Sequence, residues 1–167
     1  FSVNRHTLRR AMEVLRTEGI VDVERGRGTF VVSVPITFPI GKRVRFNESL
    51  KAQSLSPQVQ VLTAIETPAD AKVAQNLDLT AGEPVVLFER LSLIDDVPIS
   101  VSSSHFPSTQ FPGLVQHCQV YRSISEMLRQ EYDCDHIRRS TRLSSRLAEA
   151  KDARLLRMPA TRPILLS

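Results

Sequence analysis

This chain of 167 residues lacks long apolar segments. No apolar run approaches the roughly 20 residues that a membrane-spanning helix needs, and the N-terminus lacks the apolar core of a secretion signal. Apolar residues still make up 41% of the sequence, which suffices for one good core and a smaller attached module. We therefore expect a cytoplasmic protein with no membrane partner, containing one domain and a fraction of a second.

Cysteine and histidine are sparse and scattered. Cys118 and Cys134, the two cysteines, lack the close pairing of zinc ligands or of a dithiol redox motif. The four histidines do not form the spacing of zinc proteases, in which two histidines flank a glutamate; they are His6, His105, His117 and His136. Neither a metal nor another cofactor is expected.

Positive charge is modest overall but unevenly distributed. The net charge is +4, and six arginines occur in the first 27 residues: Arg5, Arg9, Arg10, Arg16, Arg25 and Arg27. Such a block can meet phosphate groups. Basic surfaces also serve solubility, so a solvated helix face is the alternative interpretation.

The first part of this basic block has the pattern of a helix. Apolar residues recur at helical spacing between residues 4 and 18, at Leu8, Ala11, Met12 and Leu15. Asn4 is a good cap for the start of the helix, and Gly19 can end it. Arg5 and Arg9 share a face away from the apolar stripe, so one face can pack while the other binds.

Two short β-prone runs follow, at residues 20–24 and 29–32. Between them Arg25, Gly26, Arg27 and Gly28 form a basic, glycine-rich turn, which predicts a hairpin. A helix that presents arginines, followed by a hairpin with an arginine tip, is typical of a winged helix-turn-helix on DNA.

These thirty residues resemble the recognition helix and wing of the GntR family of bacterial regulators. The resemblance includes Phe1, Val3, Asn4, Arg5, Thr7, Leu8, Arg9, Ala11, Leu15, Gly19, Ile20, Gly26, Gly28, Thr29, Phe30 and Val31. It implies that Asn4, Arg5, His6 and Arg9 read double-stranded operator DNA and that Arg25 and Gly26 form the wing tip. Residues 1–33 are thus expected to be the C-terminal part of the DNA-binding domain.

The family has two further helices before this point, including the one that supports the recognition helix. Without them Leu8, Ala11 and Leu15 should stay partly uncovered. We expect the present fragment to bind DNA poorly and the complete protein to be the DNA binder.

A connector and a larger domain follow. Pro35 and Pro39 favour extended backbone, which predicts a linker over residues 34–46. Patterns further along predict strands at 58–66, 84–94, 97–105 and 137–147, helices at 69–77, 123–132 and 148–156, and a two-residue turn at Asp95 and Asp96. This is an α+β domain with an antiparallel sheet, over residues 47–167.

The order of these elements resembles the UTRA effector-binding domain of the HutC branch of GntR regulators, which shares its fold with chorismate lyase. Its markers are Leu77, Leu79, Gly82, Arg90, Leu91, Pro98 and residues 155–163. The family continues for a further hairpin or so, so the domain is expected to be C-terminally incomplete. Residues 3–11 and 140–151 look closest to regulators of phosphonate uptake and breakdown.

The predicted hairpin suggests a ligand site. If Asp95 and Asp96 form the turn, Arg90 pairs with Val101, and its face also carries Ser92, Ser103 and His105. A guanidinium with nearby hydroxyls suits an anionic, oxygen-rich ligand. The resemblance places the effector-contacting pair at Arg90 and Ser92, where the family often has two arginines, and His105 at a tyrosine-like position.

Other interpretations stay open. Arg90 could instead pair with Glu89 or Asp95 at the sheet surface. Arg142 and Ser144 are further effector candidates, on a strand face shared with Arg138, Ser140 and Arg146, although such polar stripes are more often solvent-facing.

Two functions compete. The first is a homodimeric, ligand-responsive transcriptional regulator, expected to be a repressor, that senses a small anionic metabolite such as a phosphonate or phosphate. The alternative is a lyase or esterase on the chorismate lyase-like fold, with the Ser102–Ser104 run and His105 as nucleophile and base. Ser104 and His105 point to opposite faces of a strand, and no nucleophile elbow accompanies them, so we expect no enzyme.

Overall fold

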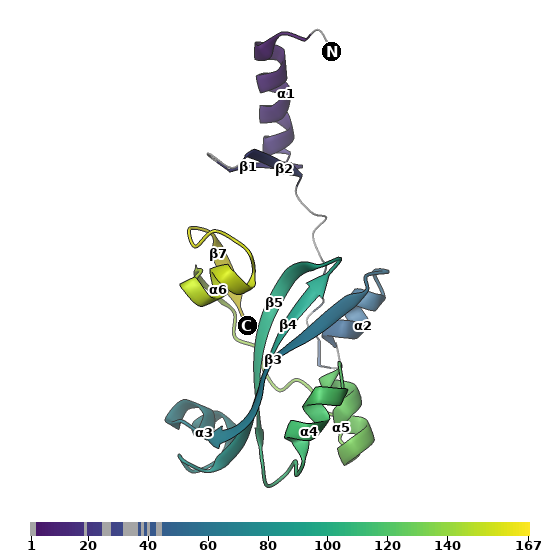
Figure 1. The fold of residues 1–167 in the computed structure, drawn as a ribbon, viewed down its shortest axis with the longest axis vertical. Helices are drawn as coiled ribbons and strands as arrows, with labels where there is room; N and C mark the ends of the chain where they lie inside the picture. Colours follow the sequence, from purple (N-terminus) through teal and green to yellow (C-terminus); the bar gives the residue numbers. More distant parts are fainter. Residues whose placement is uncertain are drawn as a thin grey trace. The chain divides into compact units, whose positions relative to one another are not determined.

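The computed structural model describes residues 3–18, 20–24, 28–31, 37, 39, 41–42 and 45–167. The chain divides into two compact units, Phe1–Thr37 and Phe38–Ser167, which are described separately (Figure 1). The proposed wing tip, Arg25 and Gly26, lies outside the described residues, as does Gly19.

The first unit contains the predicted helix and hairpin. Helix α1 spans Arg5–Thr17, and the side-chain oxygen of Asn4 caps it by accepting from the His6 backbone N–H at 3.0 Å. Strands β1 (Val21–Glu24) and β2 (Gly28–Val31) pair antiparallel. The predicted helix, its cap and the hairpin are confirmed.

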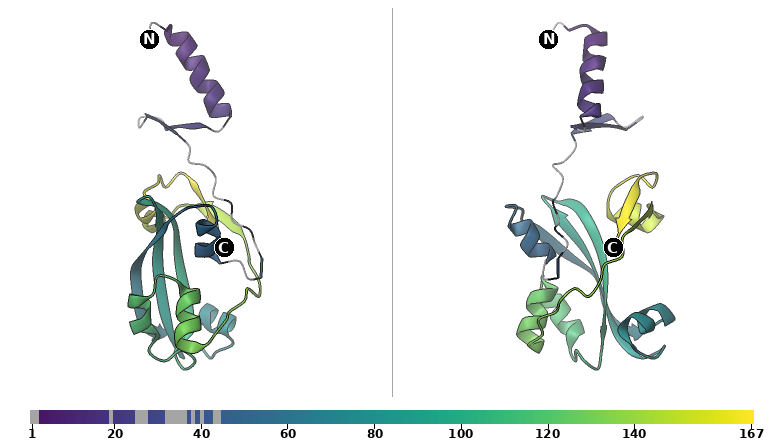
Figure 2. Two further views of the ribbon diagram at one scale, coloured as in Figure 1. Left: turned by 90° about the vertical axis from the view of Figure 1, so that its right-hand side faces the viewer. Right: turned by 180° about the vertical axis from the view of Figure 1, so that it is seen from behind.

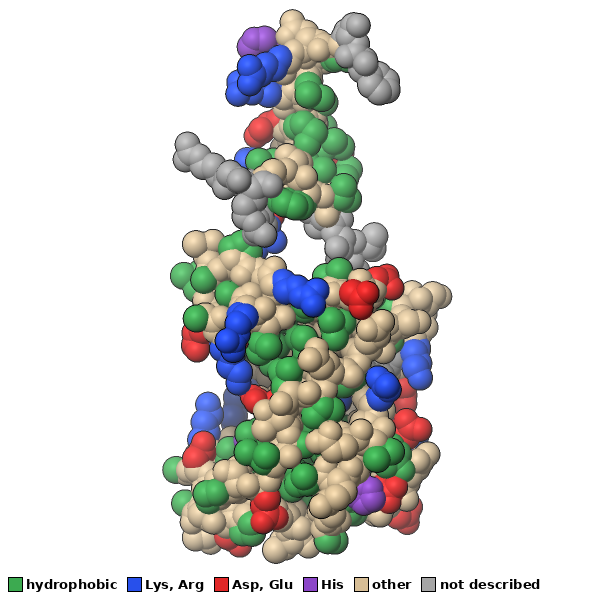
Figure 3. Space-filling model, in the orientation of Figure 1, with side chains coloured by type: hydrophobic (Ala, Val, Ile, Leu, Met, Phe, Trp, Pro, Cys, Tyr) green, Lys and Arg blue, Asp and Glu red, His purple; other side chains and the backbone are tan. Residues whose placement is uncertain are grey.

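The apolar stripe of α1 is uncovered within the described part of the chain. No residue of α1 is buried, and the Leu8 side chain is 59% exposed. Figure 3 shows hydrophobic side chains along one side of this helix and basic ones at its N-terminal end on another. The predicted exposure of this stripe is therefore confirmed.

The second unit is built on an antiparallel sheet of three strands in the order β3 (Pro57–Pro68), β4 (Pro84–Ile94) and β5 (Val97–Pro107). Asp95 and Asp96 join β4 to β5 with φ angles of 48° and 62°. Positive φ at both central residues is the mark of the tight turn that fits the twist of a hairpin. The predicted hairpin is confirmed, and each strand is as long as or longer than expected.

Helices cover both faces of this sheet (Figure 2). Helices α2 (Phe46–Lys51), α4 (Leu114–Val120) and α5 (Ile124–Tyr132) lie on one face, and α3 (Ala71–Leu77) and α6 (Ala150–Leu155) lie on the other. The sequence predicted α3, α5 and α6 but not α2 or α4. Among the residues that the structure describes, no helix is both long and apolar enough to cross a membrane.

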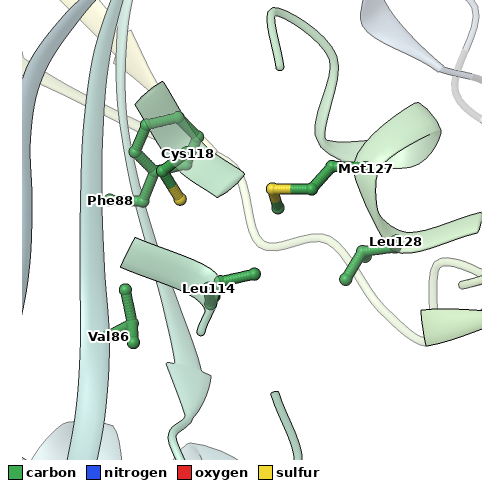
Figure 4. Packing of buried hydrophobic residues seen from close by; sticks show 6 residues of the cluster. All are labelled: Val86, Phe88, Leu114, Cys118, Met127 and Leu128. Carbon is green, nitrogen blue, oxygen red and sulfur yellow. The ribbon is translucent and has the colours of Figure 1, made fainter. Parts of the chain in front are cut away.

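The main core lies between β4 and the helices α4 and α5 (Figure 4). It contains Val86, Phe88, Leu114, Cys118, Met127 and Leu128, each no more than 3% exposed. Leu114 and Cys118 lie four residues apart on α4, and Met127 and Leu128 are neighbours on α5. They pack against Val86 and Phe88, which lie on one face of β4. This packing fixes the two helices on the face of the sheet that also bears Arg90.

A small second sheet pairs β6 (Ser144–Leu147) with β7 (Pro163–Leu166). The expectation of one strand over residues 137–147 is wrong for its first half, because only 144–147 lie against β7. Residues 137–143 have no regular secondary structure, and the Arg138 backbone N–H donates to the Lys42 carbonyl at 2.9 Å.

Candidate functional site

Two β-bulges flank Arg90 in the middle of the sheet. The register of β3 against β4 shifts between Val61 and Thr63, and that of β4 against β5 shifts beside Ser92. The second shift leaves Ile99 as the extra residue, since Leu93 pairs with Pro98 and Ser92 pairs with Ser100. Bulges of this kind re-aim side chains next to binding sites.

Because of the bulge at Ile99, the side chains of β5 that lie on the same face as Arg90 differ from those predicted. Arg90 lies opposite Ser102 instead of Val101, while Ser103 lies opposite Glu89 and His105 opposite Leu87. Because one extra residue moves every later side chain to the other face, Ser103 and His105 point away from the side of Arg90. The prediction that they share a face with Arg90 is wrong.

Next to Arg90 the surface forms a cleft of about 550 Å³. Its walls come from the start of α2, the bulged part of β5, the first turn of α5, the extended segment after α5, and β7. The lining residues are Arg45, Phe46, Glu48, Arg90, Ile99, Ser100, Val101, Ser102, Ser123, Ile124, Ser125, His136, Arg138, Leu165 and Ser167. Three arginines, one glutamate and five serines therefore line one small space.

Arg90 is the most available cation of the cleft. Its guanidinium lies 5.2 Å from the centroid of the Phe88 ring, and its Nη2 donates a long hydrogen bond of 3.4 Å to Ser102 Oγ. Its Nε is buried and has no hydrogen-bond partner in the part of the chain that the structure describes, and no carboxylate there pairs with it. Burial lowers the pKa of Arg90, but an arginine stays charged at neutral pH. Arg45 Nε is likewise buried without an acceptor, so Arg90 differs from Arg45 in that no carboxylate of the described residues pairs with it.

The carboxylate of Glu89, the residue before Arg90, accepts its hydrogen bonds on the other face of the sheet. Glu89 lies on the opposite face, where it accepts from Lys151 Nζ at 3.0 Å, Ser103 Oγ at 3.1 Å and Thr63 Oγ1 at 3.3 Å. The alternative pairing of Arg90 with Glu89 is therefore wrong: Glu89 ties α6 to the back of the sheet and leaves Arg90 to the cleft.

The other two arginines of the cleft, Arg45 and Arg138, form ion pairs or hydrogen bonds within the protein. Arg45, whose side chain is 14% exposed, pairs with Asp135 and lies 3.5 Å from Glu48. Arg138 donates through Nη1 to the Gly41 carbonyl at 2.9 Å. Partial burial, and then the charge of Arg45, lower the pKa of His136, so its imidazole is mostly neutral at pH 7.

The remaining sequence candidates lie at different places. Ser92 is 5% exposed and sits within the sheet, while Arg142 and Ser144 are exposed and do not line the cleft. Arg142 instead lines a neighbouring hollow that shares Arg138, Leu165 and Ser167 with the cleft.

Sequence reasoning missed Arg45, Ser100 and Ser102 as lining residues. It named Arg138 only as part of a polar stripe. These side chains come together only through the bulge and through contacts between segments 90 or more residues apart, such as the pair of Arg45 with Asp135.

In the first unit the proposed DNA-reading residues lie together at the start of α1. Asn4, Arg5, His6 and Arg9 are all exposed, and the Asn4 side-chain oxygen is occupied by the helix cap. The Arg16 guanidinium, further along, lies 3.5 Å from Glu13 on the surface. The exposed N-terminal turns thus present positive charge without a covering element in the described residues.

Comparison with known proteins gives two family matches. The UTRA domain matches residues 52–167, and the family described as "Bacterial regulatory proteins, gntR family" matches residues 1–31. The chain is 32% identical over 166 residues to the "Probable transcriptional regulator PhnF" of Escherichia coli, covering 99% of this chain and 68% of that protein. It is 30% identical over 166 residues to the "HTH-type transcriptional repressor PhnF" of Mycolicibacterium smegmatis, covering 99% and 67%.

The solved structures agree with these matches. The crystal structure of PhnF from Mycobacterium smegmatis superposes with a TM-score of 0.70 at 28% identity, over 99% of this chain and 72% of that one. The chain thus spans about two thirds of the length of the curated relatives described above.

Proposed function

Because this chain belongs to the GntR family of bacterial transcriptional regulators that have a UTRA domain, we propose that its cleft binds a small anionic effector which controls operator binding. Members of this family bind operator DNA, and the relatives named above are transcriptional regulators. The α+β fold with a winged-helix tail agrees with this membership. The enzyme alternative is set aside, since the family and the relatives are regulators.

The observation behind the proposed effector class is the state of Arg90. Its buried Nε lacks an acceptor among the described residues, and the Ser102 hydroxyl lies 3.4 Å from its Nη2. A phosphonate or phosphate oxygen would accept from the outer N–H donors of this guanidinium, which pairs with no carboxylate in the part of the chain that the structure describes. The aromatic ring under the guanidinium keeps it in position without neutralising its charge.

Two features favour a phosphonate or a phosphate over other anions. Residues 3–11 and 140–151 resemble regulators of phosphonate metabolism, and both curated relatives described above are named PhnF. The cleft also places Arg90, which no carboxylate among the described residues neutralises, beside the Ser102 hydroxyl, and this suits a ligand rich in anionic oxygen.

DNA binding is proposed to run through α1 and the hairpin. Arg5, His6 and Arg9 would reach base edges and phosphates, with Arg25 and Gly26 at the backbone or minor groove. A homodimer would match the two-fold symmetry of a palindromic operator. An effector then acts by preferring one arrangement of the dimer over another.

Neighbouring serines give a matched test of the cleft. Titration calorimetry of the protein with methylphosphonate, inorganic phosphate and a sugar phosphate is expected to show binding of at least one of them. Arg90→Ala should weaken binding by about 10-fold to 100-fold, the factor typical of losing a charged hydrogen bond. Ser102→Ala should weaken it several-fold, whereas Ser103→Ala, on the other face of β5, should leave it unchanged.

Two results would contradict this proposal. One is indifference of the protein to every phosphorus compound, which would reject the phosphonate and phosphate class. The other is equal weakening by Ser102→Ala and Ser103→Ala, which would mean that the cleft beside Arg90 is not the binding site.

A further inference from the structure

A second hollow adjoins the cleft beside Arg90. It has a volume of about 490 Å³, and the segment just before β6 supplies four of its lining residues: Ser140, Thr141, Arg142 and Leu143. It shares its other three lining residues with the cleft: Arg138, Leu165 and Ser167. A ligand that leaves the cleft past these shared residues therefore reaches the hollow, with Arg90 at one end and Arg142 at the other.

The charged side chains that line the hollow are both arginines. Arg142 is exposed and has no hydrogen bond or ion pair among the residues that the structure describes, whereas Arg138 already donates to the Gly41 carbonyl at 2.9 Å. Three hydroxyls complete the polar lining, and no aspartate or glutamate of the described chain contributes to it. The hollow therefore suits a group with anionic oxygens, and Arg142 is the cation that such a group would pair with.

An apolar side chain lines both spaces. Leu165, on β7, belongs to the cleft and to the hollow, and it is 73% exposed. Leu143 gives the hollow a second apolar wall and is 53% exposed. A short hydrocarbon chain lying against Leu165 would remove apolar surface from water. A molecule with two anionic ends and an apolar middle thus matches the order of these side chains.

We propose that the effector carries two anionic groups: a phosphonate or phosphate at Arg90, and a second anionic oxygen group, such as a carboxylate, that reaches Arg142 through a short hydrocarbon spacer over Leu165. This rests on the proposed anion site at Arg90. Arg142 then determines specificity, because a planar guanidinium can donate two parallel hydrogen bonds to a carboxylate. A ligand that ends in an alkyl group or an amine gains nothing from it.

Matched ligands test the second group by titration calorimetry. Phosphonoacetate, phosphonopropionate and phosphonobutyrate are each compared with the alkylphosphonate of the same carbon number. At least one of the three acids should bind about threefold to fivefold more tightly than its alkyl counterpart, the range that an exposed ion pair supports. Arg142→Ala should remove this advantage without changing the affinity for the alkylphosphonate. Arg142→Lys retains the charge but not the planar fork, so it should keep part of the advantage.

Arg139→Ala is the matched control. Arg139 is a neighbouring exposed arginine that lines neither space, so its loss should leave the advantage of the acid intact. Equal affinity of all three acids and their alkyl counterparts would overturn the proposal. Equal losses in Arg139→Ala and Arg142→Ala would also overturn it, because the acid would then respond only to the general positive charge. Failure of every phosphonate to bind would instead reject the anion site at Arg90, and the second subsite with it.

Discussion

Glu89 and Arg90 are adjacent on β4 but have different surroundings, because successive side chains of a strand face opposite sides of the sheet. Glu89 is 17% exposed and accepts from three donors on β3, β5 and α6. Arg90 keeps an N–H without an acceptor in the described chain. The Glu89 carboxylate is satisfied within the fold, whereas the Arg90 guanidinium faces the cleft.

The Glu89 network predicts a pH-dependent contribution to stability. The hydrogen bond from Lys151, followed by those from Ser103 and Thr63, outweighs partial burial and lowers the pKa of Glu89 from its ordinary 4.5. A lowered carboxyl pKa stabilises the fold above pH 4.5, and this stability is lost as the pH falls through the lowered value.

Glu89→Gln should therefore lower the free energy of unfolding by about 1 kcal/mol at pH 7. The difference from the unmodified protein should vanish at acidic pH, when Glu89 itself is protonated. Urea unfolding at several pH values measures this, with the exposed Glu66→Gln as the control that should show no such change. A constant difference across the pH range would show that the network acts through shape and not through charge.

At the scale of elements, patterns of residues close in sequence were sufficient to predict part of the fold. The Asp95–Asp96 turn, the Asn4 cap, and the helices α1 and α5 depend on residues close in sequence, and the structure has them. Helix α4 has the same length as α3, which was predicted, but its N-cap is Gly113, which provides no side-chain cap, whereas Asp70 caps α3. The Ile99 bulge and the pairing of Arg45 with Asp135 depend on long-range contacts that no local pattern encodes.

The β4–β5 turn gives a prediction of its own. Asp96 has a φ of 62°, a conformation that costs a residue with a side chain more than glycine. Asp96→Gly should raise the free energy of unfolding by up to about 1 kcal/mol. Thermal or urea unfolding measures the change.

A second substitution separates backbone strain from charge. Asp96→Ala removes the same carboxylate but keeps a side chain at positive φ, so it should not stabilise the protein. If alanine stabilised the protein as much as glycine, charge repulsion between Asp95 and Asp96 would be the cause.

At the scale of the whole molecule, the two units differ in how well they bury apolar surface. The second unit has a closed core around Phe88 and Met127, whereas α1 has no buried residue and Leu8 and Val14 are at least half exposed. Helices of this length gain most of their stability from packing, so the first unit should contribute little to the folding of the second.

Removing residues 1–37 should leave the thermal midpoint of the remaining protein within about 2 °C of the intact chain, a shift that corresponds to well under 1 kcal/mol. Circular dichroism during heating measures both midpoints, and the signal lost at low temperature reports the helix content of α1. A midpoint lowered by many degrees would mean that the first unit stabilises the second.

The extra residue at Ile99 also affects how ligand contacts can be compared among relatives. Ser102, Ser104 and Phe106 share the side of Arg90 only because β5 is bulged, and an unbulged β5 would present Ser103 and His105 there instead. Loss or gain of this one bulge thus changes which alternate set of β5 side chains lies on the side of Arg90, without any substitution. Equivalent cleft-facing positions of related domains are therefore best identified from strand pairing before residues are aligned.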